Sequence, residues 1–383
     1  MRIALVVDRF DPLRGGLEQW SAQFAAELVR RGHEVHVVAE RFSPQADEIP
    51  IVRHPLPPSR TRLGFAAAAE AALARLAVDV VHDTGAGWLC DVFQPHSGSR
   101  AAAIEHNLLL SPEWMRPWKR RLCRWLPRYR GFAALMRRQY ARDGRIFLAL
   151  SRQVADDFQH YHGIQAELVR VVYNGVDTER FSPAGRAAHR DAVRRWLGVA
   201  EHEVLLLIVA HNFRLTGVPT LIKATAQLAG RGWPVRLAVA GGKRTVQAAR
   251  HAAALGADRL VRFTGPVPDP APLYAAADIY VQPTFYDPCS LVALEALASG
   301  LPLVTSRYNG VSELLTDGLE GYVLQDPADA DELACRLESL LSVRQRDALG
   351  RAARELALRH TFAQNVDEIL SIYPHLSRRR VAA

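Results

Sequence analysis

The sequence predicts an α/β protein of two domains, each built on a parallel β-sheet with helices on both faces. Short runs of aliphatic and β-branched residues alternate along the chain with longer helix-like stretches, an order typical of parallel sheets with right-handed crossovers. At 383 residues the chain is too long for one core and suits two domains of ordinary size. Hydrophobic residues make up 49% and charged residues 23% of the chain, which excludes a disordered protein.

The first domain is expected at residues 1–175. Its expected strands are the apolar runs at 2–7, 33–38, 78–81, 92–93, 146–150 and 168–172. After the first run, Gly15 and Gly16 permit a left-handed backbone and a close approach to a ligand, with a plain strand-to-helix turn as the alternative. The fingerprint G-x-G-x-x-G does not occur there, which disfavours a nicotinamide-dependent enzyme.

Two histidines follow expected strands of this domain. His82 comes directly after the run at 78–81, and His96 lies in a loop rich in Gly and Ser. Ligands of open α/β sheets bind at the carboxyl ends of the strands. His96 is the stronger functional candidate of the two, and simple packing of its loop is the alternative.

Residues 114–142 form a basic block that also carries tryptophans. The block contains ten Lys and Arg residues and no acid, so most of the chain's net charge of +8 resides there. A solvated face or a nucleic-acid surface are the alternatives. Because Trp prefers the bilayer interface and basic residues favour anionic lipid, we interpret the block as a peripheral membrane dock for a lipid-linked acceptor, with no nucleic-acid partner. Its candidate residues are Trp114, Trp118, Lys119, Arg120, Arg121, Arg124 and Trp125.

The sequence predicts neither a membrane span nor a secretory signal. The longest aliphatic run, at 204–210, is far shorter than the roughly 20 residues of a spanning helix. Asp8 and Arg9 interrupt the apolar residues at the N-terminus. The four cysteines show no C-x-x-C or metal-ligand spacing. We therefore expect a cytoplasmic protein with reduced thiols, peripheral on the inner face of the cytoplasmic membrane.

The second domain is expected at residues 198–358, after a junction that begins at the turn Asn174-Gly175. Its expected strands are the runs at 204–210, 235–240, 261–263, 279–281 and 303–305. Arg214 and Thr216 follow the first of these strands. An arginine at such a strand end can pair with a diphosphate, and an ordinary surface arginine is the alternative.

The stretch 282–315 carries the most specific signals of the chain. Ser290 and Leu291 stand where a run of good helix formers begins. The first N–H groups of a helix have no intrahelical acceptor and the helix dipole is positive there, so this N-terminus can receive a phosphate. Glu295 lies one turn into the helix and Asp287 in the loop before it. The alternative is that Asp287 forms a turn and that Glu295 is a solvated helix residue.

This stretch resembles the donor site of family 4 of the retaining glycosyltransferases. In that family two acids are separated by seven residues, and the pattern E-A-x-A-x-G-x-P follows. Asp287 and Glu295 match the acids, and the residues ALASGLP complete the pattern. The chain has Asp287 where the family has Glu, Ser290 where it has Gly, and Thr216 where its R-x-K-G pattern has Lys, with Lys243 as a possible substitute.

The resemblance implies two Rossmann-like domains that face each other across a cleft, the GT-B architecture, with a terminal helix at about 360–383 returning to the first domain. It also implies that Asp287 contacts the transferred sugar, that Glu295 binds the ribose and that Arg214 neutralises the diphosphate. The candidate catalytic residues are Asp287, His96 and Arg214. The candidate donor-binding residues are Gly15, Gly16, Arg214, Thr216, Ser290, Leu291 and Glu295.

The expected activity is retaining transfer of a hexose from a nucleotide sugar, UDP-linked, to a hydroxyl of a glycolipid or saccharide acceptor. The chain looks most like the lipopolysaccharide core glucosyltransferases. No cofactor and no metal is expected, because the only D-x-D, at 329–331, opens a helix. The alternative is a catalytically weak scaffold that binds nucleotide sugar or membrane, motivated by the departures at 216, 287 and 290. A nucleotide-sugar isomerase of the same fold has no supporting motif.

Overall fold

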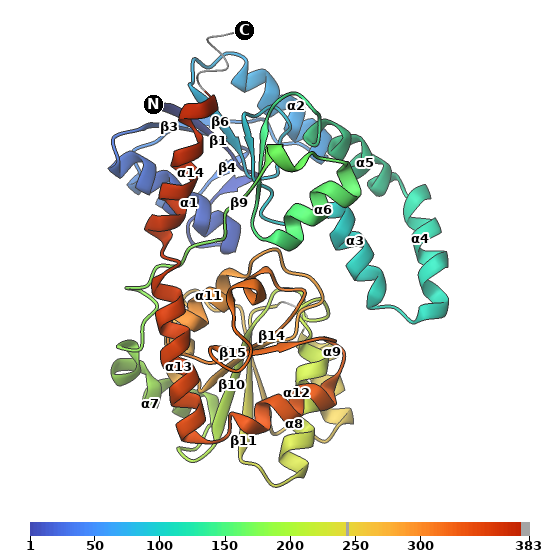
Figure 1. The fold of residues 1–383 in the computed structure, drawn as a ribbon, viewed down its shortest axis with the longest axis vertical. Helices are drawn as coiled ribbons and strands as arrows, with labels where there is room; N and C mark the ends of the chain where they lie inside the picture. The colour runs from blue at the N-terminus through green and yellow to red at the C-terminus, as the bar shows by residue number, and fades with distance from the viewer. Residues whose placement is uncertain (243–244, 377–383) are drawn as a thin grey trace. The chain divides into compact units, whose positions relative to one another are not determined.

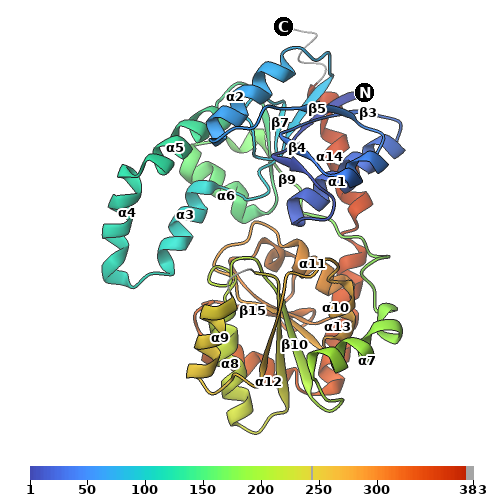
Figure 2. The ribbon, with the colours of Figure 1, turned by 180° about the vertical axis from the view of Figure 1, so that it is seen from behind.

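The computed structural model describes residues 1–242 and 245–376, without the side chains of 123–125 and 127–129. Two compact units make up the chain: Met1–Tyr173 with Ala363–Ala383, and Asn174–Phe362. Each unit contains a parallel sheet with helices packed on it (Figures 1 and 2). The predicted fold class, two Rossmann-like α/β domains, is confirmed.

The first unit has a seven-stranded parallel sheet in the order β5-β3-β1-β6-β7-β8-β9. Its strands are β1 (Arg2–Val6), β3 (Glu34–Ala39), β5 (Val52–Pro55), β6 (Val80–Asp83), β7 (Val92–Phe93), β8 (Ile146–Ala149) and β9 (Val169–Val171). A separate pair joins β2 (Arg9–Phe10) to β4 (Arg41–Phe42). From β1 the chain builds outward through β3 to β5 and then returns to place β6 on the other side of β1. The switch point of this sheet therefore lies between β1 and β6.

Helices cover this sheet, and one pair of them extends beyond it. The helices are α1 (Gly16–Arg30), α2 (Arg62–Leu73), α3 (Arg100–Leu109), α4 (Arg116–Trp125), α5 (Pro127–Gln139), α6 (Arg152–His162) and α14 (Phe362–Ile372), with a short 3₁₀ helix η2 (Glu113–Met115) before α4. Both views show α4 and the end of α3 standing away from the sheet of this unit (Figures 1 and 2). No helix in the described part of the chain is both long and apolar enough to cross a bilayer.

The second unit has a six-stranded parallel sheet in the order β12-β11-β10-β13-β14-β15. Its strands are β10 (Val204–Val209), β11 (Val235–Ala240), β12 (Val261–Gly265), β13 (Ile279–Gln282), β14 (Leu303–Ser306) and β15 (Gly321–Leu324). Its helices are α7 (Gly185–Leu197), α8 (Val218–Gly230), α9 (Thr245–Ala254), α10 (Ala271–Ala276), α11 (Leu291–Ala298), α12 (Ala330–Ser339) and α13 (Val343–Leu358), with a 3₁₀ turn η4 (Gly310–Leu314). Buried aliphatic side chains of β10, β11 and α8 form its core.

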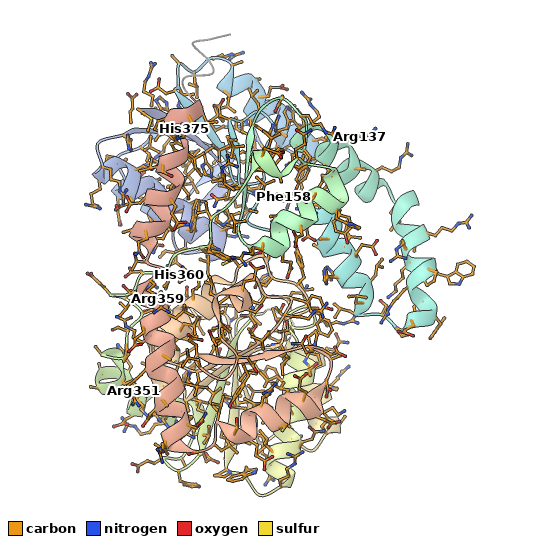
Figure 3. All side chains as sticks on the ribbon, viewed as in Figure 1. Arg137, Phe158, Arg351, Arg359, His360 and His375 are labelled. Atoms are coloured by element: carbon orange, nitrogen blue, oxygen red, sulfur yellow. The ribbon has the colours of Figure 1, made fainter. Side chains whose placement is uncertain are left out.

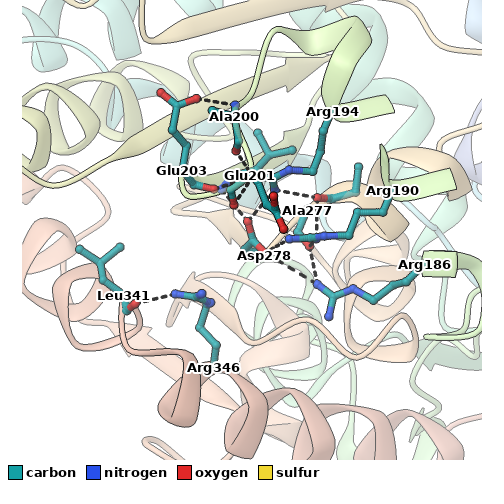
Figure 4. Close-up of polar contacts among 12 residues, drawn as sticks. Arg186, Arg190, Arg194, Ala200, Glu201, Glu203, Ala277, Asp278, Leu341 and Arg346 are labelled. Carbon is teal, nitrogen blue, oxygen red and sulfur yellow. Dashed lines mark hydrogen bonds and ion pairs between the residues drawn. The ribbon is translucent and has the colours of Figure 1, made fainter. Parts of the chain in front are cut away.

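An arginine cluster joins α7 to the start of β13. Arg190 and Arg194 both bind the buried carboxylate of Asp278, at 2.7 and 2.9 Å, and the N–H of Leu205 in β10 donates to the same carboxylate at 2.8 Å (Figure 4). Arg186 donates to the carbonyl of Ala277 at 2.8 Å. Successive arginines are four positions apart, so all three lie on one face of α7. The cluster fixes the outer helix to the end of the sheet opposite the site described below.

The sequence analysis missed the edge strands β5 and β15. β5 has the sequence Val-Arg-His-Pro, and three of its four residues are exposed, so it lacks a buried apolar run. β15 is a four-residue strand that begins with Gly321. Gly321 lies so close to β14 that an added Cβ would be 1.8 Å from the carbonyl oxygen of Leu303. Pairing with a neighbouring strand, which no local pattern reveals, creates both elements.

Candidate active site

The candidate site of the second unit lies at the switch point of its sheet. β10 and β13 are neighbours there, and the loops that follow them are hydrogen bonded to each other. The N–H of Phe285 and the hydroxyl of Thr284 both donate to the carbonyl of Leu215, at 2.8 and 3.1 Å. Gly217 has a φ of +78°, and a Cβ at this position would lie 2.0 Å from the carbonyl oxygen of Pro283. Gly217 thus allows the two loops to pack together.

Asp287 projects from the loop after β13 into a chain of hydrogen bonds. The Nε2 of Gln282 donates to Oδ2 of Asp287 at 3.1 Å, and the Oγ of Ser290 donates to Oε1 of Gln282 at 2.9 Å. Burial raises the pKa of Asp287 to about 6, against the opposing effect of hydrogen bonds from Gln282 and Ser290. At neutral pH the carboxyl is therefore mainly ionised, yet it exchanges its proton within the physiological range.

The backbone around Asp287 is held by the segment that follows β14. The N–H of Asp287 donates to the carbonyl of Tyr308 at 2.9 Å, and the N–H of Gly310 donates to the carbonyl of Asp287 at 2.8 Å. The Oδ1 of Asn309 accepts from the N–H groups of Ser290 and Val311, at 3.3 and 3.2 Å. The loop that carries the carboxylate is consequently fixed from both sides.

A second asparagine supports the same loop from the start of the unit. The Nδ2 of Asn174 donates to the carbonyl of Cys289 at 2.7 Å, and both residues are buried. The Asn-Gly turn at 174–175, recognised in the sequence only as a domain junction, therefore also positions the segment before α11.

Ser290 is the N-cap of α11, as the sequence suggested, and its Oγ accepts from the N–H of Ala293 at 3.4 Å. Its φ is −65°, so the backbone does not require glycine there. By helix geometry the N–H groups of Leu291 and Val292 have no intrahelical acceptor. These two N–H groups are the anion receptors that this helix start can offer.

Glu295 lies one turn into α11 and contacts α10. The hydroxyl of Tyr274, which is fully buried, donates to Oε2 of Glu295 at 2.8 Å and lies 3.1 Å from the carbonyl oxygen of Val292. Burial raises the pKa of Glu295 to about 7, while the Tyr274 bond and the charge of Arg180 act in the opposite direction. Tyr274 therefore sets the orientation of this carboxyl, a role that the sequence analysis did not assign.

Arg214 and Thr216 both lie in the loop after β10. Arg214 is exposed. The Oγ1 of Thr216 donates to the carbonyl of Asn212 at 2.9 Å, as its own N–H does at 3.0 Å. Thr216 thus closes the turn and adds no charge to it. Lys243, the suggested substitute cation, lies outside the described residues.

Gly15 and Gly16 lie at the start of α1 in the first unit. Gly15 is the N-cap of α1 with a φ of −159°, an extended backbone that any residue adopts, and neither glycine has a positive φ. The left-handed backbone that these glycines permit is not adopted, and the structure has the alternative, a plain strand-to-helix turn. A role of Gly15 and Gly16 in donor binding stays a prediction.

His96 and His82 have different environments in the first unit. His96 packs against the ring of Trp20 with centroids 4.2 Å apart, and its Nε2 is buried without a hydrogen-bond partner among the described residues. Burial lowers the pKa of His96 to about 3, so its ring is neutral. His82 is fully buried between the Tyr373 hydroxyl and the Gln94 amide, at 2.7 and 2.9 Å, which makes it a structural residue.

A carboxylate that the sequence analysis passed over shapes the loop after β6. Asp83 accepts hydrogen bonds from the N–H groups of Gly85, Ala86 and Gly87, at 2.7 to 2.8 Å. The amide of Gln139 donates to the carbonyls of Gly85 and Gly87. Burial raises the pKa of Asp83 to about 7 although the three N–H groups oppose this. An Asp before Thr-Gly-Ala-Gly is the local signal that could have predicted this structure.

The basic block forms two helices with exposed tryptophans. Trp114 and Trp118 are 75% and 76% exposed. Lys119 donates to Ser111 and Arg120 pairs with Glu105, so these two cations are partly engaged, whereas Arg121 is exposed. The side chains of Arg124 and Trp125 lie outside the described residues.

Prolines divide the block into short, separate helices. Pro117 lies in the first turn of α4, and Pro127 is the first residue of α5. A proline in the first turn lacks only an N–H that would have no intrahelical acceptor.

Comparisons with known proteins agree with this architecture. Residues 14–180 match the model of Glycosyltransferase Family 4, and residues 189–356 match that of Glycosyl transferases group 1. The crystal structure of WaaG, a glycosyltransferase involved in lipopolysaccharide biosynthesis, superposes with a TM-score of 0.81 at 24% identity, over 97% of this chain and 99% of that one. The protein is a GT-B glycosyltransferase.

The names of other relatives of this GT-B glycosyltransferase mention different substrates. A D-inositol 3-phosphate glycosyltransferase of Corynebacterium kroppenstedtii is 31% identical over 76% of this chain, and the match spans 65% of that relative. Its counterpart in Corynebacterium jeikeium is 27% identical over 98% of this chain and 97% of its own. The structure of Anabaena HepE in complex with UDP-glucose has a TM-score of 0.71 at 20% identity, covering 97% and 99% of the two chains.

The residues gathered at this site of the GT-B glycosyltransferase include some that the sequence predicted and others that it did not. Asp287, Ser290 and the start of α11 gather at one switch point, and the loop of Arg214 is bonded to the loop of Asp287. The residues that orient them were missed because each is an ordinary polar side chain whose partner is distant in sequence: Asn174, Tyr274, Gln282, Thr284 and Asn309.

Proposed function

We propose that this GT-B glycosyltransferase transfers a hexose, with retention of configuration, from a UDP-linked sugar to a hydroxyl of a cell-envelope glycolipid. The observation that carries the proposal is the placement of Asp287 and Glu295 around the start of α11, at the carboxyl edge where open α/β sheets bind ligands. The family models support a glycosyltransferase, and the HepE complex supports a UDP-sugar donor.

In the proposed complex, the diphosphate accepts hydrogen bonds from the N–H groups of Leu291 and Val292 and pairs with Arg214. Glu295 accepts a hydrogen bond from a ribose hydroxyl, and its orientation by Tyr274 favours one geometry. Asp287, ionised above its pKa of about 6, faces the hexose. Its negative charge stabilises the positive charge that develops at the anomeric carbon.

The proposed reaction needs no protein nucleophile. The bond between the anomeric carbon and the diphosphate oxygen breaks, and a bond to the acceptor oxygen forms on the same face of the sugar. The acceptor proton passes to an oxygen of the leaving diphosphate, which the α11 N–H groups and Arg214 stabilise. Nucleoside diphosphate and the glycosylated acceptor are the products. Independence from metal ions remains a prediction.

Nucleotide release tests this function. The full-length protein is incubated with UDP-glucose and with several other UDP- and GDP-sugars, with and without a glycolipid acceptor. Acceptor-dependent release of UDP supports transfer. Tight donor binding without turnover supports instead the scaffold alternative, which the departures at Thr216, Asp287 and Ser290 motivate.

The exposed Trp114 and Trp118 favour a glycolipid acceptor, because they can enter the interface of a bilayer. In this proposal the protein works in the cytoplasm, peripheral on the inner face of the cytoplasmic membrane. The names of the corynebacterial relatives favour a second candidate, a phosphorylated cyclitol. A lipopolysaccharide core fragment and inositol 3-phosphate, offered separately with the same donor, distinguish the two acceptors.

A further inference from the structure

Arg100 is a half-buried arginine whose positive charge is unmatched within the first unit. Its guanidinium lies over the ring of Phe132, 4.5 Å from the centroid. Within 1–242 and 245–376, it donates no hydrogen bond and forms no ion pair. Burial lowers the pKa of Arg100, and the charge of Arg62 lowers it further. A guanidinium carries five N–H donors. No nitrogen of Arg100 is among the described atoms that are both buried and without a partner, so its donors reach solvent and are accessible to a ligand.

Helix electrostatics add to this excess of positive potential. Arg100 is the first residue of α3, and Arg62 is the first residue of α2. Neither helix has an acid in its first turn. A helix N-terminus carries a partial positive charge that favours acids and disfavours cations. An arginine is thus unfavourable at both positions unless an anion is present nearby.

The one acid recorded close to these arginines is already engaged. Asp8 follows β1 and pairs with Arg62 at 3.6 Å. It raises the pKa of Arg100 only weakly compared with the lowering by burial. Asp8 therefore compensates Arg62 and leaves the charge of Arg100 available.

These residues lie at the ligand-binding edge of the first sheet. Asp8 lies two residues after the end of β1, which borders the switch point, and α3 begins after the loop that follows β7. In a parallel α/β sheet such helix starts lie at the carboxyl ends of the strands, where ligands bind. Arg100 directly follows Ser99, the N-cap of α3, so it lies at the end of the loop that carries His96.

We propose that Arg100 anchors an anion site in the first unit, which takes a phosphate group carried by the acceptor. The statement that the acceptor carries this phosphate rests on the proposed function. The existence of the anion site does not depend on it. The planar guanidinium can bind two phosphate oxygens side by side. A doubly charged phosphate suits a site with two arginines and two helix N-termini better than a singly charged carboxylate. Arg100 is then a specificity-determining residue, and acceptors without phosphate bind more weakly.

Titration calorimetry of the full-length protein with inorganic phosphate tests the site directly. We expect Arg100→Gln to weaken phosphate binding about tenfold or more and Arg100→Lys to have an intermediate effect. The matched control is Arg137→Gln, which removes an exposed arginine of α5 (labelled in Figure 3) and should leave binding unchanged. The proposal is wrong if the wild type shows no saturable binding or if Arg100→Gln binds phosphate within twofold of it.

Folding of the variants is checked by circular dichroism. If Arg100→Gln does not fold, the comparison of Arg100→Lys with the wild type decides, because it keeps the charge and loses only the planar fork. Phe132→Leu gives independent evidence. This variant removes the ring beneath the guanidinium, and we expect it to weaken phosphate binding roughly threefold.

Two further experiments are needed. Vesicle binding tests whether the phosphate belongs to a lipid headgroup, and donor binding tests the proposed function separately from the anion site. Vesicles of phosphatidylcholine, with and without phosphatidylglycerol, should bind Arg100→Gln as they bind the wild type. A variant that loses vesicle binding but keeps phosphate binding would mean that Arg100 contacts lipid headgroups, and this overturns the proposal. Donor binding, followed with UDP-glucose alone, should not change in Arg100→Gln. A wild type that uses no donor contradicts the proposed function, while the phosphate titration still decides the anion site.

Discussion

The hydroxyl of Ser290 donates to the amide oxygen of Gln282 at 2.9 Å, and this bond directs the amide NH₂ of Gln282 toward Asp287. A serine at this position therefore acts on the carboxylate through the glutamine, in addition to its own effect on the pKa of Asp287. The glycine that the family pattern has there could not make this contact.

Ser290→Ala should change the ionisation of Asp287. Loss of the hydroxyl frees the Gln282 amide to rotate, and hydrogen bonds that lower the pKa of Asp287 are weakened. We expect the acidic limb of the profile of kcat/KM against pH to move to higher pH. The helix cap is lost as well, at a cost of about 1 kcal/mol in the free energy of unfolding. The control is Ser342→Ala, at an N-cap without a side-chain hydrogen bond, and an unchanged profile for Ser290→Ala contradicts the relay.

The stability of the protein should depend on Asp287 and Glu295 between about pH 4 and 7. Burial raises the pKa of Asp287 to about 6 and that of Glu295 to about 7, above their values in an unfolded chain. In this window the folded state binds more protons at these groups than the unfolded state does. Their contribution to the free energy of unfolding therefore decreases as pH rises. Urea unfolding at several pH values should show a shallower decrease for Asp287→Asn and Glu295→Gln, and slopes equal to the wild type would contradict the assignment.

Thr216→Lys should increase turnover. A lysine in the loop after β10 adds a cation near the proposed leaving diphosphate, and we expect a rise in kcat of roughly tenfold. Loss of the hydrogen bond to Asn212 costs about 1 kcal/mol of stability. Steady-state assays should compare this variant with Thr216→Met, which has similar length and no charge. Equal rates in the two variants would show that charge at 216 is not limiting.

Asp278→Asn should destabilise the second unit strongly. The substitution leaves the buried Arg194 without its carboxylate, and breaking a buried pair in this way costs about 3–5 kcal/mol. Thermal unfolding followed by circular dichroism measures the effect. Arg195→Ala removes an exposed arginine from the same helix and serves as the control, with little expected change. A small effect of Asp278→Asn would mean that water or Arg190 compensates the loss.

Trp118→Ala should weaken binding to anionic vesicles. The indole is 76% exposed on α4, which also carries the exposed Arg121, so the folded state loses little packing. We expect a several-fold decrease in vesicle affinity in sedimentation assays, with an unchanged melting temperature. Trp196→Ala, at a half-exposed tryptophan of the second unit, is the matched control. Equal losses for both variants would indicate unspecific adsorption and contradict a docking role for α4.

The sequence was most informative where one segment determines its own structure. The strand at Ile279–Gln282, the N-cap at Ser290 and the apolar pattern of α11 are local signals, and the structure has all three. The partners of the acids were not predictable in this way. Tyr274 is 21 positions from Glu295, and its sequence context indicates only a core residue. The structure shows that its hydroxyl donates to the carboxylate of Glu295.

Glycine patterns were the least reliable signal. Gly15 and Gly16 suggested a left-handed turn, but the first of them is extended. Gly217, by contrast, has a positive φ and lies so close to a neighbouring loop that there is no space for a Cβ. The difference lies in the surroundings of the backbone, which a pair of adjacent glycines does not reveal.

The bond between His82 and Tyr373 joins the middle of the first unit to the end of the chain. Translation proceeds from the N-terminus, so the ribosome releases residues 1–173 long before the segment that completes their unit. The nascent first unit lacks the segment that contacts His82 and Trp20 until the whole second unit has been synthesised. Premature termination between residues 173 and 362 would consequently impair the first unit, although most of its residues had already been made.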